Sequence, residues 1–413
     1  MVFALIAAVA LLLELVLARV LGKSGYGIYV YAVTISGFLV FAARAGIDFA
    51  IVRFVPEHLA REQWDKAKGL LQFSQWFVVA TSLGTLVIIY IVIILFVRDH
   101  NPELAETLFF SVWLVPGMAL GIVYQAAARA FKVVVLPQFI MHVLPSLFLV
   151  GMVYALHVYS TKTISAQDAA LYKSILTFLV MLALMTVHRR MVPVQIRRAR
   201  PAYEVKKWIG GGAAIFSIMI MTQLIFQIGT LQLGWLIHTD TAGIYNAANK
   251  IAQLAAFPFM AVNMLGAPLI AELYTSGRID DLQSLLKRIT RITFAGTAII
   301  VIVLSVSGKW FLGLFGHDFT EAYIPLCILL AGQLFIALSG PLLTVMAQTG
   351  KHRPASIIVG CSVLLNVVLN FILIPKFGMY GAASASSFVL IVHRVVASAY
   401  MRKHGTQQRT IFN

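Results

Sequence analysis

Long apolar stretches separated by short polar segments dominate the hydropathy pattern of this chain. Each stretch has the length of about 20 residues that an α-helix needs to cross roughly 30 Å of hydrocarbon. A transmembrane β-barrel would instead show segments of about 10 residues with alternating hydrophobicity. The pattern therefore predicts twelve spanning helices, at residues 1–21, 27–54, 69–97, 105–130, 136–158, 166–187, 208–237, 242–272, 288–315, 321–347, 355–374 and 378–400.

Composition assigns the chain to the all-α polytopic membrane proteins. Of its 413 residues, 60% are hydrophobic and only 12% are charged, whereas about a quarter of a soluble domain is charged. The first stretch lacks a basic leader and a small-residue cleavage site and contains Glu14, so it is interpreted as a span and not as a signal peptide. Because the chain begins inside this apolar helix, we expect a short cytoplasmic arm before it.

The net charge of +16 has two explanations, a nucleic-acid partner or basic cytoplasmic loops. The loops after even-numbered spans, their helix ends and the C-terminal tail hold 21 of the 32 Lys and Arg residues, and the segments after odd-numbered spans hold six. Cytoplasmic loops of membrane proteins carry such an excess of Lys and Arg. The distribution places both termini in the cytoplasm and argues against a nucleic-acid partner.

Short motifs recur at a nearly constant offset, which predicts two repeats. Gly27-Ile28-Tyr29 returns as Gly243-Ile244-Tyr245, Asp65 corresponds to Asp281, and Pro137 corresponds to Pro354. An even number of helices per repeat gives two halves that run in the same sense. We expect a six-helix lobe at 1–187, a basic cytoplasmic linker at 188–207, and a second six-helix lobe at 208–413 that ends in a short cytoplasmic tail.

Several charged residues fall inside or near otherwise apolar spans, where charges are costly and often mark a substrate or ion pathway. Arg44 and Asp48 are four residues apart, so they are predicted to share a helix face and to neutralise each other. Glu14 has no basic residue three or four positions away, and it is a candidate for ion coupling or for pairing with a cation on another helix. Asp48 is a second ion-coupling or charge-balancing candidate.

Neutral polar residues form stripes at helical spacing in three later spans. Each stripe must face protein or water and not lipid, so two explanations stay open, hydrogen bonds between helices or a substrate cavity. For Arg44, Asp48 and Lys250 the charge favours an aqueous cavity, which would be cationic and suited to a pyrophosphate or an acidic sugar. The stripe residues are Gln223, Gln227 and Thr230, then Asn246, Asn249, Lys250 and Gln253, then Ser362, Asn366 and Asn370.

Two further features concern helix interruptions and the cytoplasmic boundary. Pro116 and Gly117 interrupt the fourth span, and Gly340 and Pro341 interrupt the tenth, so all four are gating candidates, although Gly and Pro are common in transmembrane helices. Three other arginines are expected near the cytoplasmic boundary, within reach of a lipid-anchored phosphate: Arg53, Arg129 and Arg394.

Catalytic motifs are absent from the sequence. Gly22-Lys23-Ser24 is like the end of a phosphate-binding loop, but Leu17 stands where that motif needs its first glycine. There is no HExxH, no nucleophile elbow and no His/Cys cluster with metal-ligand spacing, and Cys327 and Cys361 lie within apolar spans. We therefore expect no enzymatic activity, no cofactor and no metal site.

The chain resembles the polysaccharide and O-antigen flippases of the multidrug/oligosaccharidyl-lipid/polysaccharide exporter superfamily. Three stretches spread over the chain carry the resemblance, and each is short by itself: Leu17-Ala18-Arg19-Val20-Leu21-Gly22 with Tyr26-Gly27-Ile28-Tyr29; Ala242-Gly243-Ile244-Tyr245-Asn246-Ala247-Ala248-Asn249-Lys250-Ile251-Ala252; and Ile374-Pro375-Lys376-Phe377-Gly378-Met379-Tyr380-Gly381-Ala382-Ala383.

The resemblance implies a V-shaped, MATE-like fold of two six-helix lobes around a central cavity. It also implies that undecaprenyl-pyrophosphate-linked oligosaccharides are moved from the cytoplasmic to the outer leaflet by alternating access. Arg19 and Lys250 match positions within family motifs, so the resemblance gives them a role in the cavity. Gly229 departs from the pattern, because many relatives have an acidic residue near this point of the seventh span.

The sequence thus predicts a flippase of the bacterial inner membrane that serves surface polysaccharide synthesis. Its expected partners are a lipid-linked anionic oligosaccharide and membrane lipids, with the polysaccharide polymerase and chain-length machinery as further candidates. An ion-coupled multidrug exporter is one alternative, although the excess of Lys and Arg argues against cationic substrates. A lipid II flippase is a second alternative, and a membrane glycan polymerase or ligase, which generally needs a large periplasmic loop, is a third.

Overall fold

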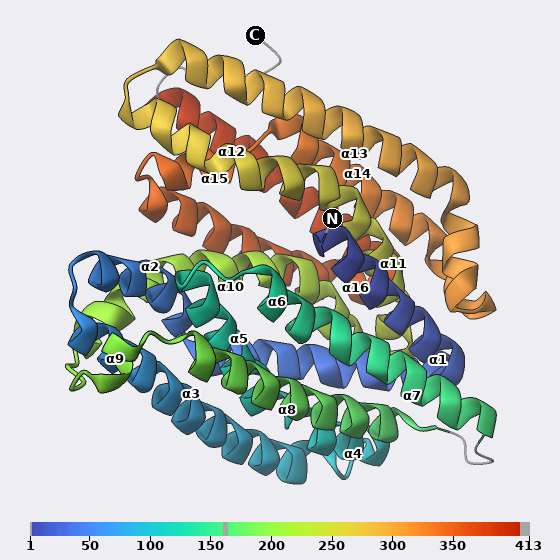
Figure 1. Cartoon of the computed structure of the whole chain (residues 1–413). Helices are drawn as coiled ribbons and strands as arrows, with labels where there is room; N and C mark the ends of the chain where they lie inside the picture. Colours follow the sequence, from blue (N-terminus) through green and yellow to red (C-terminus); the bar gives the residue numbers. More distant parts are fainter. Residues whose placement is uncertain (1, 160–163, 405–413) are drawn as a thin grey trace. The chain divides into compact units, whose positions relative to one another are not determined.

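The computed structural model describes residues 2–159 and 164–404, and every regular element in these two ranges is helical (Figure 1). The chain divides into two compact units, Met1–Ser217 and Ile218–Asn413. One helix, α10 (Val205–Leu236), begins in the first unit and ends in the second. The all-helical architecture expected from the hydropathy pattern is confirmed.

The helices follow one another with short connections. In the first unit they are α1 (Val2–Arg44), α2 (Ile47–Ala60), α3 (Trp64–Val92), η1 (Ile93–Val97), α4 (Pro102–Ser111), α5 (Leu114–Ala130), α6 (Val135–Gln138), η2 (Phe139–Val143), α7 (Leu144–Tyr159), α8 (Ala166–Met191) and α9 (Val194–Arg198). After α10 come α11 (Thr239–Gln253), η3 (Leu254–Ala256), α12 (Phe257–Thr275), α13 (Ile279–Phe315), η4 (His317–Ala322), α14 (Tyr323–Ser339), α15 (Leu342–Gln348) and α16 (His352–His404).

Two of these helices are too long to be single spans. α1 has 43 residues and α16 has 53, whereas about 20 residues cross a bilayer. Each contains a glycine outside the helical region, Gly22 (φ 67°, ψ −176°) in α1 and Gly378 (φ 57°, ψ −132°) in α16. Figure 1 shows the two parts of α1 running in different directions. Glycine adopts a positive φ without steric cost, which explains why both breaks occur where they do.

The number of spans agrees with the sequence prediction once these breaks are counted. Nine helices of the described chain are long and apolar enough to cross a membrane, and the bent pair from Thr239 to Thr275 makes ten. Dividing α1 at Gly22 and α16 at Gly378 adds one span each and gives the expected twelve. The chain is a multi-pass membrane protein.

The repeat is visible in the helix boundaries as well as in the motifs. The break at Gly22 corresponds to His238, which precedes α11, at an offset of 216 residues. The starts of α3 at Trp64 and α13 at Ile279 differ by 215 residues, and those of α6 and α16 differ by 217. Related helices therefore begin at related positions in the two halves of the sequence.

The second predicted span, 27–54, is not continuous, and that prediction was wrong. α1 ends at Arg44 and α2 begins at Ile47, because Ala45 (φ 44°) and Gly46 (φ 83°) adopt left-handed conformations. A Cβ at position 46 would lie 2.6 Å from the Cβ of Phe216. Both the backbone conformation and the close approach of α10 therefore require glycine at 46.

The basic segment before α10 packs closely against α3. The Lys68 ammonium donates to the carbonyls of Arg197 (2.7 Å) and Ala199 (2.8 Å). The Ala202 N–H donates to the Asp65 carbonyl at 3.0 Å, and a side chain at Gly69 would collide with the Ala202 carbonyl. This segment thus belongs to the first compact unit, whose boundary lies within α10. A separate linker at 188–207 between two lobes stays a prediction.

Candidate functional site

A buried ion pair lies at the junction of α1 and α2. The Arg44 Nη1 lies 2.8 Å from the Asp48 Oδ2, and the two residues are only 6% and 3% exposed. Arg44 also donates from Nε to the Val40 carbonyl (3.4 Å), and its guanidinium lies 4.8 Å from the centre of the Phe41 ring. The predicted pairing of Arg44 with Asp48 therefore forms, but it does so across a break between two helices and not along one continuous helix.

A second cation extends this pair. Arg129, near the end of α5, interacts electrostatically with both Asp48 and Arg44. Its Nε and the Asp48 Oδ1 are both buried without a hydrogen-bond partner. The Asp48 carboxylate thus forms an ion pair with Arg44 and acts at longer range on Arg129, and the three residues together carry a formal charge of +1. Such a cluster attracts anions. Sequence reasoning placed Arg129 at the boundary and missed its relation to Asp48.

Glu14 has partners from elsewhere in the first unit. The Tyr26 hydroxyl donates to the Glu14 Oε2 at 2.9 Å. Lys173 of α8 interacts electrostatically with the Glu14 carboxylate, and its Nζ lies 5.3 Å from the centre of the Tyr29 ring. The sequence contains no local signal for this pairing, because the residues are far apart along the chain.

In the second unit, the neutral stripes join three helices. The Asn249 side chain of α11 donates to the Phe226 carbonyl of α10 (2.9 Å), and the Asn366 side chain of α16 donates to the adjacent Ile225 carbonyl (3.1 Å). The Asn370 amide donates to the Asn366 Oδ1 at 3.2 Å. All three asparagines are buried. Hydrogen bonds between helices, one of the two explanations kept open, therefore occupy the side-chain amides of Asn249 and Asn366, and Asn370 supports Asn366 from the same helix.

The remaining stripe residues differ in exposure. Asn246 of α11 is buried, and Lys250 and Gln253 on the same helix are half-buried. On α10, Gln223 is exposed and Gln227 is half-buried. Arg19, in the first part of α1, is exposed. The structure therefore groups Asn246, Asn249 and Lys250 on one helix, and their part in substrate binding stays a prediction.

Gly229, where the resemblance led us to expect an acidic residue, has a steric explanation. A Cβ at this position would lie 3.1 Å from the Tyr245 hydroxyl and 3.2 Å from the Tyr245 Cε1. Tyr245 is fully buried on α11. The aromatic side chain thus occupies the space that an acidic side chain at 229 would need.

Both predicted interruptions are present, and each also has a packing role. Pro116 has no N–H to donate to the Val112 carbonyl. That carbonyl instead accepts a hydrogen bond from the Val115 N–H at 2.9 Å, and the chain is interrupted here between α4 and α5. A Cβ at Gly117 would lie 2.9 Å from the Thr177 Cγ2. Gly340 (φ +71°), followed by Pro341, separates α14 from α15. Gating at these positions stays a prediction.

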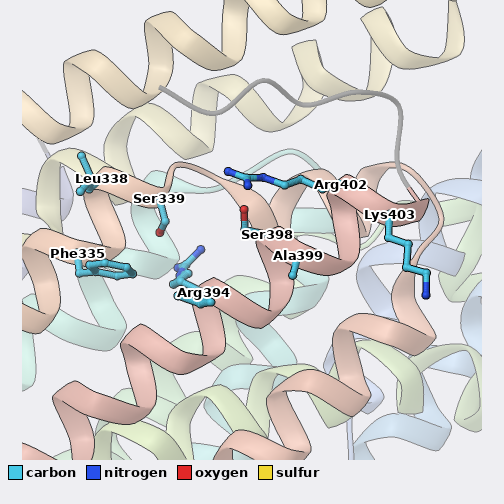
Figure 2. Close-up of a pocket in the computed structure, with 9 residues that line it drawn as sticks. Phe335, Leu338, Ser339, Arg394, Ser398, Ala399, Arg402 and Lys403 are labelled. Carbon is cyan, nitrogen blue, oxygen red and sulfur yellow. The ribbon is translucent and has the colours of Figure 1, made fainter. Parts of the chain in front are cut away.

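Two cavities have basic linings. One of about 460 Å³ in the first unit is lined by Lys68, Gln72, Gln75, His188, Arg189 and Arg197, among others. One of about 560 Å³ in the second unit lies between α14 and α16 and contains Arg394 (Figure 2). Sequence reasoning expected Arg394 near the membrane boundary but did not foresee the cavity. The spacing of Arg394, Ser398 and Arg402, four residues each, is the signal that could have indicated it.

Family and sequence comparisons agree with this architecture. The family described as Polysaccharide biosynthesis protein matches residues 1–273, and the family described as MatE matches residues 214–372. An uncharacterized membrane protein of Methanocaldococcus jannaschii is 24% identical, over 93% of this chain and 78% of that protein. The capsular polysaccharide biosynthesis protein CapF of Staphylococcus aureus is 27% identical, over 37% of this chain and 39% of that protein.

Solved structures share the fold. A multidrug resistance MATE family transporter of the MOP superfamily, in an inward-facing conformation, superposes with a TM-score of 0.80 at 13% identity, over 96% of this chain and 93% of that one. The lipid II flippase MurJ in an inward closed conformation gives a TM-score of 0.71 at 14% identity, over 97% and 86% of the two chains. The MATE-like transporter fold expected from the sequence motifs is thus confirmed.

Proposed function

We propose a specific flippase function for this chain, which belongs to the polysaccharide biosynthesis protein family of multi-pass membrane transporters. The proposed substrate is an undecaprenyl-pyrophosphate-linked oligosaccharide unit for a surface polysaccharide. The proposed location is the bacterial inner membrane with both termini in the cytoplasm, as the distribution of Lys and Arg indicates. The capsular polysaccharide protein among the relatives supports the same class of pathway.

The observation that carries this proposal is the excess of positive charge within the spans. Asp48 forms an ion pair with Arg44 and interacts electrostatically with the additional cation Arg129. Glu14 has Tyr26 and Lys173 as partners. Lys250 adds another cation to a helix that is otherwise neutral at this point. A pyrophosphate carries the negative charge that would complement this surplus.

In the proposed mechanism, the cationic groups hold the pyrophosphate or an acidic sugar while the lipid tail stays in the bilayer. The protein alternates between two access states, with the interruptions at Pro116–Gly117 and Gly340–Pro341 as flexible points. A coupling ion can bias this cycle only if it binds one state better than the other. Glu14 and Asp48 are the acidic side chains that could provide such a difference.

The alternatives predict different substrates. An ion-coupled multidrug exporter would need carboxylates for cationic drugs, but both acids deep in the first unit have polar or basic partners. A lipid II flippase shares the fold and transports an anionic lipid-linked substrate, so a direct comparison of substrates must separate it from the proposed function.

The test is a flipping assay in proteoliposomes with a fluorescent undecaprenyl-pyrophosphate oligosaccharide. We expect flipping by the wild-type protein and a loss of roughly tenfold or more in Arg129→Gln and Lys250→Gln, since each variant lacks a charge-assisted contact. Arg353→Gln, which removes an exposed charge from α16, is the matched control. Flipping of lipid II alone, or export of cationic dyes alone under an ion gradient, would overturn the proposal.

A further inference from the structure

The cavity in the second unit combines apolar walls with a concentration of positive charge. It has a volume of about 560 Å³ and lies beside the last turn of α14 and the last turns of α16. Phe335 and Leu338 of α14 and Val395 of α16 supply apolar surface. Arg394, Arg402 and Lys403 supply positive charge, and none of the described lining residues is acidic. The cavity is therefore suited to a ligand with an anionic part and an apolar part.

The polar groups of the cavity converge. Arg394, Ser398 and Arg402 are four residues apart, so they lie on one face of α16. Figure 2 shows the side chains of Arg394, Arg402, Ser398 and Ser339 directed toward a common space, whereas Lys403 points away. Two guanidinium groups and two hydroxyl groups thus surround one position.

Arg394 is the key residue because its charge is buried without a matching carboxylate. It is 7% exposed, and no ion pair with an acid is present for it in the described chain. Its Nη1 donates to the Gly340 carbonyl at 3.4 Å, and its guanidinium lies 5.6 Å from the centre of the Phe259 ring. Its Nε is buried without a hydrogen-bond partner. A buried charge of this kind is costly unless it is compensated.

Capping of α14 accounts for only part of this arrangement. A cation near the C-terminus of a helix interacts favourably with the helix dipole, and Gly340 directly follows α14. However, the bond to Gly340 uses one of the five N–H donors of the guanidinium. Capping alone explains neither the unpartnered Nε of Arg394 nor the direction of the Ser398 side chain toward it. An anionic ligand would account for them.

We propose that this cavity binds the phosphate of an anionic membrane phospholipid, at a site separate from the transported substrate. Guanidinium groups bind phosphate oxygens with paired, charge-assisted hydrogen bonds, and the Ser398 hydroxyl can donate a further one. The apolar walls and Val395, which is 54% exposed, favour a lipid over a free phosphate. The position at the end of a span is the depth at which headgroups lie.

The test uses the full chain in a neutral detergent, with thermal stability measured as phosphatidylglycerol, phosphatidylcholine or inorganic phosphate is added. We expect phosphatidylglycerol to stabilise the wild-type protein at lower concentrations than phosphatidylcholine. Arg394→Gln should weaken this response by roughly tenfold or more, which is the loss of one charge-assisted hydrogen bond. Arg353→Gln, on the same helix, should respond like the wild type.

A second variant keeps the test informative if Arg394→Gln does not fold. Ser398→Phe keeps both arginines and fills the space between them, so it should also reduce the response to phosphatidylglycerol. An unchanged response in both variants would overturn the site, and an equal shift with inorganic phosphate alone would overturn its assignment to lipid. Lys250 does not line this cavity, so Lys250→Gln should respond to phosphatidylglycerol like the wild type. The stability assay therefore tests the lipid site, and the flipping assay tests the flippase proposal, independently of each other.

Discussion

Arg44 in the first unit and Arg394 in the second are buried to the same extent but have different partners. Their exposed fractions are 6% and 7%. Arg44 has a carboxylate oxygen at 2.8 Å, whereas the one hydrogen bond assigned to Arg394 in the described chain is to a carbonyl at 3.4 Å. The comparison indicates that burial alone does not define the role of an intramembrane arginine. The partner decides whether the charge is already compensated.

The energetic consequences of the two arrangements are opposite. A buried ion pair contributes little net stability compared with apolar residues, but removal of one partner leaves an uncompensated charge. Arg44 is such a partner. Its loss would leave Asp48, which is only 3% exposed, with the more distant Arg129 as its compensating cation. Arg394 has no carboxylate partner among the described residues that its loss would leave behind. Substitutions at the two sites should therefore change stability in opposite directions.

The largest effect is expected for Arg44→Met. This change leaves Asp48 charged and buried, which should destabilise the protein by about 3–5 kcal/mol. Thermal unfolding in detergent measures the loss, and the double variant Arg44→Met with Asp48→Leu should recover most of it. If Arg44→Met is as stable as the wild type, the pair does not neutralise Asp48 and the contrast with Arg394 is lost.

A smaller effect of opposite sign is expected for Arg394→Met. In a neutral detergent without anionic lipid, the loss of the uncompensated charge should stabilise the protein by about 1 kcal/mol, because the desolvation cost exceeds the value of one hydrogen bond and one ring contact. Addition of phosphatidylglycerol should then stabilise the wild type but not the variant. A destabilisation as large as that of Arg44→Met would mean that Arg394 is a structural residue.

Sequence reasoning was most successful where a property repeats along the chain. Hydropathy predicted twelve spans, and the positions of Gly22 and Gly378 reconcile that number with fewer, longer helices. It failed at Gly46, because a two-residue break within an apolar run changes neither length nor composition. It could not find the pairing of Lys173 with Glu14 or the Arg394 cavity, since these depend on contacts between distant residues.

The smallest effect concerns an ion pair near the surface, which extends the comparison to a third environment. Glu204 lies 2.6 Å from the Lys66 Nζ and 3.4 Å from the Lys207 Nζ. The hydrogen bond from Lys66, with the charges of both lysines, lowers the pKa of the Glu204 carboxyl below its ordinary value of 4.5. Because the pKa is lowered on folding, this stabilisation is fully present above about pH 4.5 and is lost as the pH falls through the lowered pKa.

Glu204→Gln should therefore destabilise the protein by less than about 1 kcal/mol at neutral pH, and the difference from the wild type should disappear in acid. Thermal unfolding of both proteins between neutral and acidic pH measures this, with Glu62→Gln, a change at an exposed acid of the same unit, as the control. High salt should also reduce the difference for Glu204, whereas the buried pair of Arg44 and Asp48 should be much less sensitive to salt. A difference at Glu204 that persists in acid would show that the glutamate acts through packing and not through its charge.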